Sequence, residues 1–165
     1  MNTVVKLETP PLDRPPVLTI RAARAGDLMQ LMDMIALHAE CHGEQAKLSA
    51  ADLDRDVFGA SPWVTALVAE AGARLIGYAL LVPMYRAMEG VRGMDLHQIF
   101  VRKDHRGTGI GRHLVNRARE QARLSGCGYL SVGAATGNFA AHRFYEQMSF
   151  KAGPVTGMRY VQAIA

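Results

Sequence analysis

A short loop near the middle of the chain has the residue types and spacing of a phosphate-binding site. It reads Arg106-Gly107-Thr108-Gly109-Ile110-Gly111 and follows an apolar run that ends at Val101. Glycines permit positive φ angles and let a ligand come close to the backbone. A helix that starts at this loop leaves unpaired N–H groups and the positive end of its dipole facing outward. The sequence therefore predicts a phosphate or pyrophosphate site, with Arg106 and Arg112 as charged donors.

Two common nucleotide-binding motifs do not match this loop. A Walker A loop requires Gly-Lys-Ser/Thr, whereas the chain has Gly111-Arg112-His113. A dinucleotide fingerprint that begins at Gly107 requires glycine at the position of Arg112. The residue identities exclude both motifs.

The loop is similar to the signature Q/R-x-x-G-x-G/A of the GNAT superfamily of N-acetyltransferases, through Arg106, Gly109 and Gly111. A second element of that superfamily, N-x-x-A-x-x-x-Y-E-x-x-x-F, is matched by Asn138, Ala141, Tyr145, Glu146 and Phe150. The resemblance extends from about Val17 to Val161. It implies acetyl-CoA as cosubstrate, no metal, and direct attack of a primary amine of a small molecule on the thioester.

The resemblance also implies a fold and a cofactor path. The implied fold is α/β, of the mixed α+β kind: a largely antiparallel mixed sheet of six or seven strands, flanked by four helices and splayed between strands 4 and 5. The domain would span residues 17–165, after a Pro-rich tail of residues 1–16. The implied cofactor contacts lie on the fourth strand, its splayed neighbour, the loop and the second element: Ile99, Phe100, Val101, Arg106, Gly107, Thr108, Gly109, Ile110, Gly111, Arg112, Ser131, Val132, Asn138 and Tyr145.

Two of these residues have alternative interpretations. Tyr145 matches the tyrosine that commonly protonates the leaving thiolate in the family, and the pKa of a phenol is close enough to that of a thiol for this role. It could instead be a packing residue beside Phe144. Asn138 is expected to donate to the cofactor, although asparagine at a helix start is also an ordinary N-cap.

The general base is where the chain departs from the relatives that it resembles most, the diamine acetyltransferases of the spermidine/spermine type. Those enzymes have Leu-Glu-Asp on the fourth strand, and this chain has Leu96-His97-Gln98. His97 can act as a base because imidazole titrates near neutral pH. It could equally be a histidine that only lines the pocket, and Asp95 and Glu89 are nearby alternatives.

The loss of two carboxylates also weakens the case for a polyamine acceptor. A polycation favours a pocket lined by acidic groups, so an amine that carries a carboxylate is at least as plausible. Acylation of a protein N-terminus or lysine, and a non-catalytic acyl-CoA sensor, are the alternatives. The family resemblance further implies a homodimer.

Composition narrows the class of protein. The net charge is +4, but the basic residues form no continuous stripe with interleaved aromatics, so no nucleic-acid partner is expected. The apolar segments are too short for a membrane span, and two distant cysteines fit a reducing compartment, which favours the cytoplasm. His38, Cys41 and His42 have the spacing of metal ligands on a helix, but a fourth ligand is not evident and no metal site is expected.

Apolar periodicity predicts the elements that position these residues. Helices are expected after Asp27, after a capping box at Ser49 to Asp52, and over 109–124 and 139–148. Pro83 is expected to end a strand, with a loop over 85–93. Strands are expected at 17–21, 64–69, 75–82, 96–101, 129–132, 150–152 and 158–161.

Overall fold

The computed structural model describes residues 17–154 and 160–164. They fall into two compact units, which divide between Val132 and Gly133 and are described separately. The predicted tail of residues 1–16 and half of the predicted strand at 158–161 lie outside the described residues, and the described half, residues 160 and 161, is not strand.

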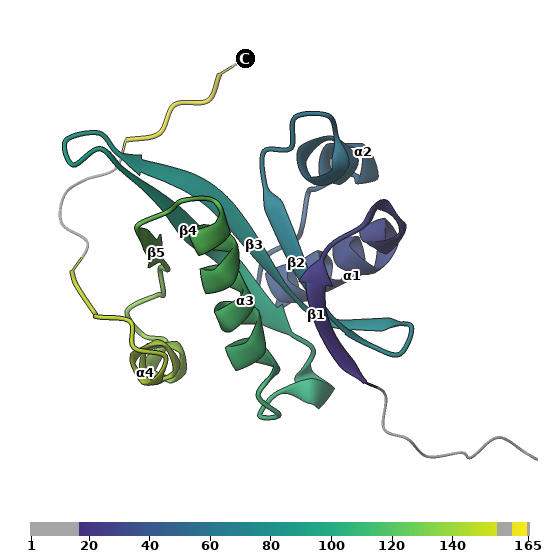
Figure 1. The fold of residues 1–165 in the computed structure, drawn as a ribbon. Coiled ribbons are helices and arrows are strands. Elements are labelled where there is room, and N and C mark those ends of the chain that lie inside the picture. Colours follow the sequence, from purple (N-terminus) through teal and green to yellow (C-terminus); the bar gives the residue numbers. More distant parts are fainter. Residues whose placement is uncertain (1–16, 155–159, 165) are drawn as a thin grey trace, which may run out of the picture. The chain divides into compact units, whose positions relative to one another are not determined.

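One sheet forms the centre of the first unit (Figure 1). Its strand order is β1-β2-β3-β4-β5, with antiparallel pairs up to β4 and a parallel pair of β4 with β5. The bounds are β1 Leu18–Ala22, β2 Thr65–Ala71, β3 Arg74–Arg86, β4 Val91–Val101 and β5 Tyr129–Ser131. Five of the seven predicted strands are found here, although several of their ends differ from the prediction.

Helices cover both faces of this sheet. They are α1 Leu28–Cys41, α2 Ala50–Leu53 and α3 Ile110–Leu124, with short helical turns at Ala25–Asp27, Asp54–Phe58 and Lys103–His105. Tyr78 of β3 is fully buried in a cluster with Leu31 and Met34 of α1. The next-door residue Gly77 faces Leu114 of α3 instead. Because neighbouring strand residues point to opposite faces, α1 and α3 lie on opposite sides of the sheet, as Figure 1 shows.

The long helix α3 forms as its sequence predicts. Its four expected apolar contacts are all buried, namely Ile110, Leu114, Val115 and Ala118. The other face is rich in basic side chains, so the amphipathic pattern fixes which side meets the sheet. This packing holds the first turn of α3, and with it the glycine loop, at the end of β4.

Two other expected helix starts have different outcomes. The capping box before α2 is confirmed, because the Ser49 hydroxyl accepts from the Asp52 N–H at 3.1 Å and Asp52 accepts from the Ser49 N–H at 3.1 Å. Asp27 immediately precedes α1, but its side chain does not cap that helix. Its carboxylate accepts from the Arg24 N–H at 2.7 Å and pairs with Arg21 at 2.6 Å.

Several predictions of strand ends are wrong. Pro83 does not end β3, which continues to Arg86, and the predicted loop over 85–93 is largely strand. Beyond Leu81 the strand pairs with β4 alone, so the N–H that Pro83 lacks is not needed on the other side. Residues 150–152 are not a strand, and the described residues contain a sheet of five strands rather than six or seven.

The second unit contains α4, Phe139–Gln147. Asn138 caps its start, since its side-chain oxygen accepts from the Ala141 N–H at 3.0 Å. The helix begins and ends within one residue of the predicted range of 139–148. Among the helices that the structure describes, none combines the length and apolar character needed to cross a membrane.

Candidate functional site

The glycine loop has the backbone geometry of an anion cradle. Gly107 and Gly109 have φ angles of +78° and +88°, and a side chain on either would meet no atom within 4 Å. Gly109 is the N-cap of α3, and no side chain caps the helix there. The N–H groups of the first turn, at Ile110, Gly111 and Arg112, therefore point to a side that the loop itself leaves open. This arrangement favours a negatively charged ligand.

Two side chains of the loop bind to nearby backbone. The Thr108 hydroxyl donates to the His105 carbonyl at 2.7 Å, which closes the turn before the helix. Arg106 donates from Nε to the Val101 carbonyl at 2.9 Å. Its guanidinium lies 5.6 Å from the centre of the Phe100 ring, so the charge of Arg106 is held beside the end of β4.

The strand β4 has a free edge where it approaches the loop. It pairs with β5 only over Gly93 to Asp95, opposite Tyr129 to Ser131. From Leu96 to Val101 the described residues give it no strand partner on that side. The predicted cofactor residues Ile99, Phe100 and Val101 lie on this stretch, so backbone groups along it can bind an extended ligand.

His97 occupies a β-bulge. Leu81 pairs with Leu96 and Leu80 with Gln98, so His97 is an extra residue with no partner on β3. Its side chain is 61% exposed, and Nδ1 lies 3.7 Å from an oxygen of Asp95. The other oxygen of Asp95 accepts from the Ser131 hydroxyl at 2.7 Å. A bulge redirects a side chain, and here it leaves an imidazole exposed with a carboxylate behind it.

Glu89, the other acidic alternative to His97, lies far from it. It is in the turn between Arg86 and Val91, the last paired residues of the β3–β4 hairpin. Six residues of strand separate Val91 from His97, which corresponds to about 20 Å. Of the two acidic alternatives, only Asp95 is close to His97.

A chain of hydrogen bonds extends from Gln98 into α1. The buried Tyr78 hydroxyl donates to Gln98 Oε1 at 2.9 Å. The Tyr78 oxygen must then accept from His38 Nδ1, 2.8 Å away, and His38 Nε2 lies 3.2 Å from His42 Nε2. Burial raises the pKa of Tyr78 above its usual range, so the phenol remains a donor. Burial, with smaller effects of His42 and Arg106, lowers the pKa of His38.

This chain of bonds determines the orientation of the Gln98 amide. Because Oε1 is bound to Tyr78, the amide nitrogen is the group that remains to donate to a ligand. In the residues described, the two histidines and Cys41 do not form a set of three metal-ligating side chains. His38 instead serves the hydrogen-bond chain, and Cys41 Sγ lies 3.7 Å from the Arg106 guanidinium.

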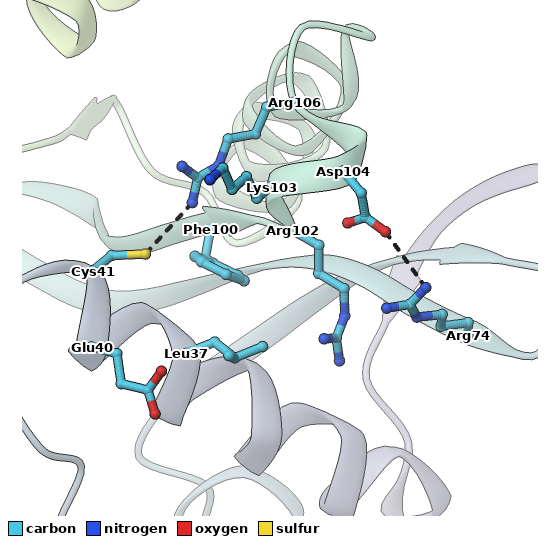
Figure 2. A pocket seen from close by; sticks show the side chains of 9 residues that line it. All are labelled: Leu37, Glu40, Cys41, Arg74, Phe100, Arg102, Lys103, Asp104 and Arg106. Carbon is cyan, nitrogen blue, oxygen red and sulfur yellow. Dashed lines mark hydrogen bonds and ion pairs between the residues drawn. The ribbon is translucent and has the colours of Figure 1, made fainter.

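A cavity of about 860 Å³ lies between the last turn of α1 and the β4–α3 connection (Figure 2). We call it the basic cavity. Its lining includes the predicted cofactor residues Phe100 and Arg106, together with residues of α1 that the sequence did not assign to a pocket. The full lining is Leu37, Glu40, Cys41, Arg74, Phe100, Arg102, Lys103, Asp104 and Arg106.

Tyr145 and Asn138, the remaining predicted site residues, both belong to α4 or its start in the second unit. The Tyr145 ring packs against Phe144 and Phe150, with ring centres 5.3 Å and 5.6 Å away. Burial raises the pKa of Tyr145. Because Asn138 uses its side-chain oxygen as the helix cap, its amide nitrogen is the group left for a ligand.

These features combine an anion loop, a free strand edge and an exposed imidazole, as expected for acyl transfer from a nucleotide-linked thioester. The acetyltransferase (GNAT) family matches residues 31–150. The chain belongs to this family. The match covers the loop, β4 and α4 and thus confirms the resemblance read from Arg106, Gly109, Gly111 and the element around Tyr145.

Individual relatives agree with the family. A thialysine N-epsilon-acetyltransferase of Sus scrofa is 31% identical over 139 residues, which is 78% of this chain and 81% of the relative. An L-methionine sulfoximine/L-methionine sulfone acetyltransferase of Pseudomonas aeruginosa is 31% identical over 52% of this chain and 49% of its own length. A crystal structure described as a transcriptional regulator from Bacillus halodurans has a TM-score of 0.74 and 26% identity, and covers 87% of this chain and 100% of its own.

The sequence located the loop, the strand and His97, but it missed three features of the site. The bulge at His97 depends on pairing with β3, and the Tyr78–His38 bond joins residues 40 positions apart. The wall of the basic cavity formed by α1 was also missed. The one signal in the sequence is the run of His38, Cys41 and His42, whose spacing is typical of metal ligands on a helix and does not by itself indicate a pocket.

Proposed function

We propose that the chain transfers an acetyl group from acetyl-CoA to a primary amine of a small molecule. The observation that carries this proposal is the uncapped start of α3, behind two glycines of positive φ, at the end of a strand with a free edge. A pyrophosphate fits the uncapped start of α3, and an extended pantetheine fits the free edge of the strand. Membership of the acetyltransferase family supports acetyl as the group transferred.

The loop supplies the affinity for the cofactor. Backbone N–H groups between Gly107 and Arg112 would bind the pyrophosphate, with Arg106 and Arg112 adding charge. Among the described residues, no atom lies within 4 Å of a Cβ built on Gly107 or Gly109, so phosphate oxygens can approach the backbone closely there. Backbone groups of Ile99 to Val101, and of Ser131 and Val132, would hold the pantetheine along the edge of β4.

His97 is proposed as the general base. The bound thioester supplies an electrophilic carbonyl, and the amine nitrogen forms a bond to it while the bond to sulfur breaks. One proton of the amine passes to His97 Nε2, because Nδ1 faces Asp95 at 3.7 Å. Asp95 lies on the Nδ1 side of the ring, which leaves Nε2 as the nitrogen that would face the amine. Asp95, bonded to Ser131, would act here by positioning His97.

Tyr145 is proposed as the proton donor to the leaving sulfur. Its burial raises the pKa, so the phenol carries its proton at neutral pH. The Asn138 amide nitrogen would contact the cofactor from the start of α4. Both roles are carried over from the resemblance in the second sequence element.

The acceptor is proposed to be a small amine that is not a polyamine. Relatives named for thialysine and for methionine derivatives support a small acceptor of the amino-acid kind, although a further relative is named for spermidine/spermine. His97 and Gln98 stand where diamine acetyltransferases have two carboxylates, which removes the charges that attract a polycation. A homodimer and a cytoplasmic location stay predictions from the sequence.

Thiol release from acetyl-CoA across a panel of small amines and short peptides tests the proposal. The expected result is turnover with at least one small amine, reduced about 100-fold or more in Tyr145→Phe and in His97→Ala, as for removal of a general acid or base. Asn116→Ala, an exposed change on α3, is the matched control. Turnover with peptides alone would refute the small-molecule acceptor, and binding of acetyl-CoA without turnover would favour the sensor.

A further inference from the structure

We propose that the basic cavity binds an anionic end of the acceptor, so that the preferred substrate is an amine separated by a short alkyl chain from a carboxylate. This inference rests on the function proposed above and names the substrate class.

The cavity has an excess of positive charge. Four basic side chains and two acidic ones line it. Two of the basic groups have carboxylate partners: Arg102 contacts Asp33 at 2.6 Å, and Arg74 contacts Asp104 at 3.6 Å. The other two, Lys103 and Arg106, form no ion pair within residues 17–154 and 160–164.

Lys103 is therefore the group available to the anionic end of an acceptor when CoA is bound, because Arg106 is assigned above to the pyrophosphate of the cofactor. The bonds of Arg106 are to the Val101 carbonyl and the Cys41 thiol, neither of which neutralises its charge. Figure 2 shows Arg106, Lys103 and Arg102 all reaching the cavity from the β4–α3 connection. Glu40, from α1 on the other side, is the only acidic lining residue besides the paired Asp104. An anion is attracted to this side of the cavity, and a second ammonium group is repelled.

The cavity also has an apolar surface. Leu37 of α1 and the ring of Phe100 form part of the lining. Phe100 is only 6% exposed, which makes it a fixed wall rather than a mobile side chain. A ligand with an alkyl segment and an anionic head matches this combination of surfaces better than inorganic phosphate does.

The position of Phe100 on β4 sets the separation between the two ends of the acceptor. Phe100 is two residues from Gln98 and three from His97, which corresponds to about 7 and 10 Å along a strand. An acceptor that reaches from His97 to the part of the cavity beside Phe100 would bridge a separation of this order. The α-amine and carboxylate of an amino acid share one carbon and cannot span it. A terminal amine on a side chain, or an ω-amino acid, can.

Three amines of equal length that differ only in the distal group test this inference: ε-aminocaproate, hexylamine and hexamethylenediamine. Their binding is measured by calorimetry on the full chain saturated with CoA, and their acetylation by thiol release. We expect ε-aminocaproate to bind about five-fold more tightly than hexylamine, since an exposed ion pair contributes up to about 1 kcal/mol. Hexamethylenediamine should be the weakest, and added salt should reduce the preference.

The variant Lys103→Met tests whether the preference for the carboxylate arises in the cavity. The matched control is Arg123→Met, which removes an exposed charge in the last turn of α3. The ratio of ε-aminocaproate to hexylamine should fall about two- to five-fold in Lys103→Met and stay constant in Arg123→Met. Indifference to the distal charge in the unmodified protein would overturn the inference. A Lys103→Met effect confined to the KM for acetyl-CoA would also overturn it, because the cavity would then hold a cofactor phosphate.

The two proposals can fail separately. Charge-selective binding without acetylation of any amine would refute the proposed function and leave the anion site standing. Acetylation of all three amines at equal rates would refute the anion site and leave the transferase standing.

Discussion

Replacing Gly109 by alanine is expected to strain the backbone of the cofactor loop, at a cost that can be measured in stability or in affinity for acetyl-CoA. Gly109 has φ +88° and ψ −3°, in the left-handed region. An L-residue pays about 1–2 kcal/mol there. Because an added Cβ would meet no atom within 4 Å, contact with neighbours adds nothing to this cost. The penalty of Gly109→Ala is therefore the backbone term alone.

This penalty must appear in one of two measurements. If the loop keeps its conformation, the free energy of unfolding falls by about 1–2 kcal/mol. If the loop relaxes to negative φ, its N–H groups turn away and acetyl-CoA binds about 5- to 30-fold more weakly. Urea unfolding and calorimetric titration with acetyl-CoA, performed on the same protein, together capture the full cost.

Gly26→Ala is the control for this prediction. Its added Cβ also meets no atom within 4 Å, and its φ is not positive, so both stability and affinity should change little. The reasoning is refuted if Gly109→Ala changes neither quantity. It is equally refuted if the two variants lose the same amount, because the effect would then be general to glycine replacement.

Three further variants test the frame that holds the site. Asp27→Ala should lower the free energy of unfolding by about 3 kcal/mol, since it leaves the nearly buried Arg21 with one partner fewer. The Arg21 guanidinium holds the pKa of Asp27 below its usual value. The stability that Asp27 contributes is therefore fully present above the usual pKa of an aspartate, and it is lost as the pH falls through the lowered pKa. Urea unfolding at decreasing pH should show this loss in the unmodified chain and not in Asp27→Ala. Gly93→Ala should lower stability by about 1–3 kcal/mol in urea unfolding, because its Cβ would overlap the Tyr129 ring across the β4–β5 pair; an unchanged midpoint would contradict this packing. Ser49→Ala should cost about 1 kcal/mol through loss of the α2 cap, and equal stability by thermal unfolding would show that the cap is not formed.

The parts of the site that the sequence predicted are those determined by local pattern. The glycines at 107 and 109, the amphipathic face of α3 and the cap at Asn138 each depend on residues within one or two turns. Such features follow from backbone freedom and periodicity, and the structure confirms them. The family resemblance added Tyr145, whose role stays a prediction.

The parts that the sequence could not predict depend on contacts between distant segments. Asp27 was expected to cap α1 because its local position is typical of a cap, but the positive charge of Arg21 binds it more strongly. Pro83 was expected to end β3, since the pattern does not reveal which strand edge carries a partner. The hydrogen-bond chain from Gln98 through Tyr78 to His38 depends on how α1 packs on the sheet. This packing cannot be predicted from the types of these three residues alone.

The most direct test of the central claim is mass spectrometry of an amine panel after incubation with acetyl-CoA that carries a deuterated acetyl group. The account predicts a small amine that gains the labelled acetyl group in equal amount to the free CoA thiol, with both products lost together in Tyr145→Phe. Free thiol without a labelled amine would mean that water, not an amine, accepts the acetyl group. Tight binding of acetyl-CoA with neither product would contradict the assignment of this chain as an acetyltransferase of small amines.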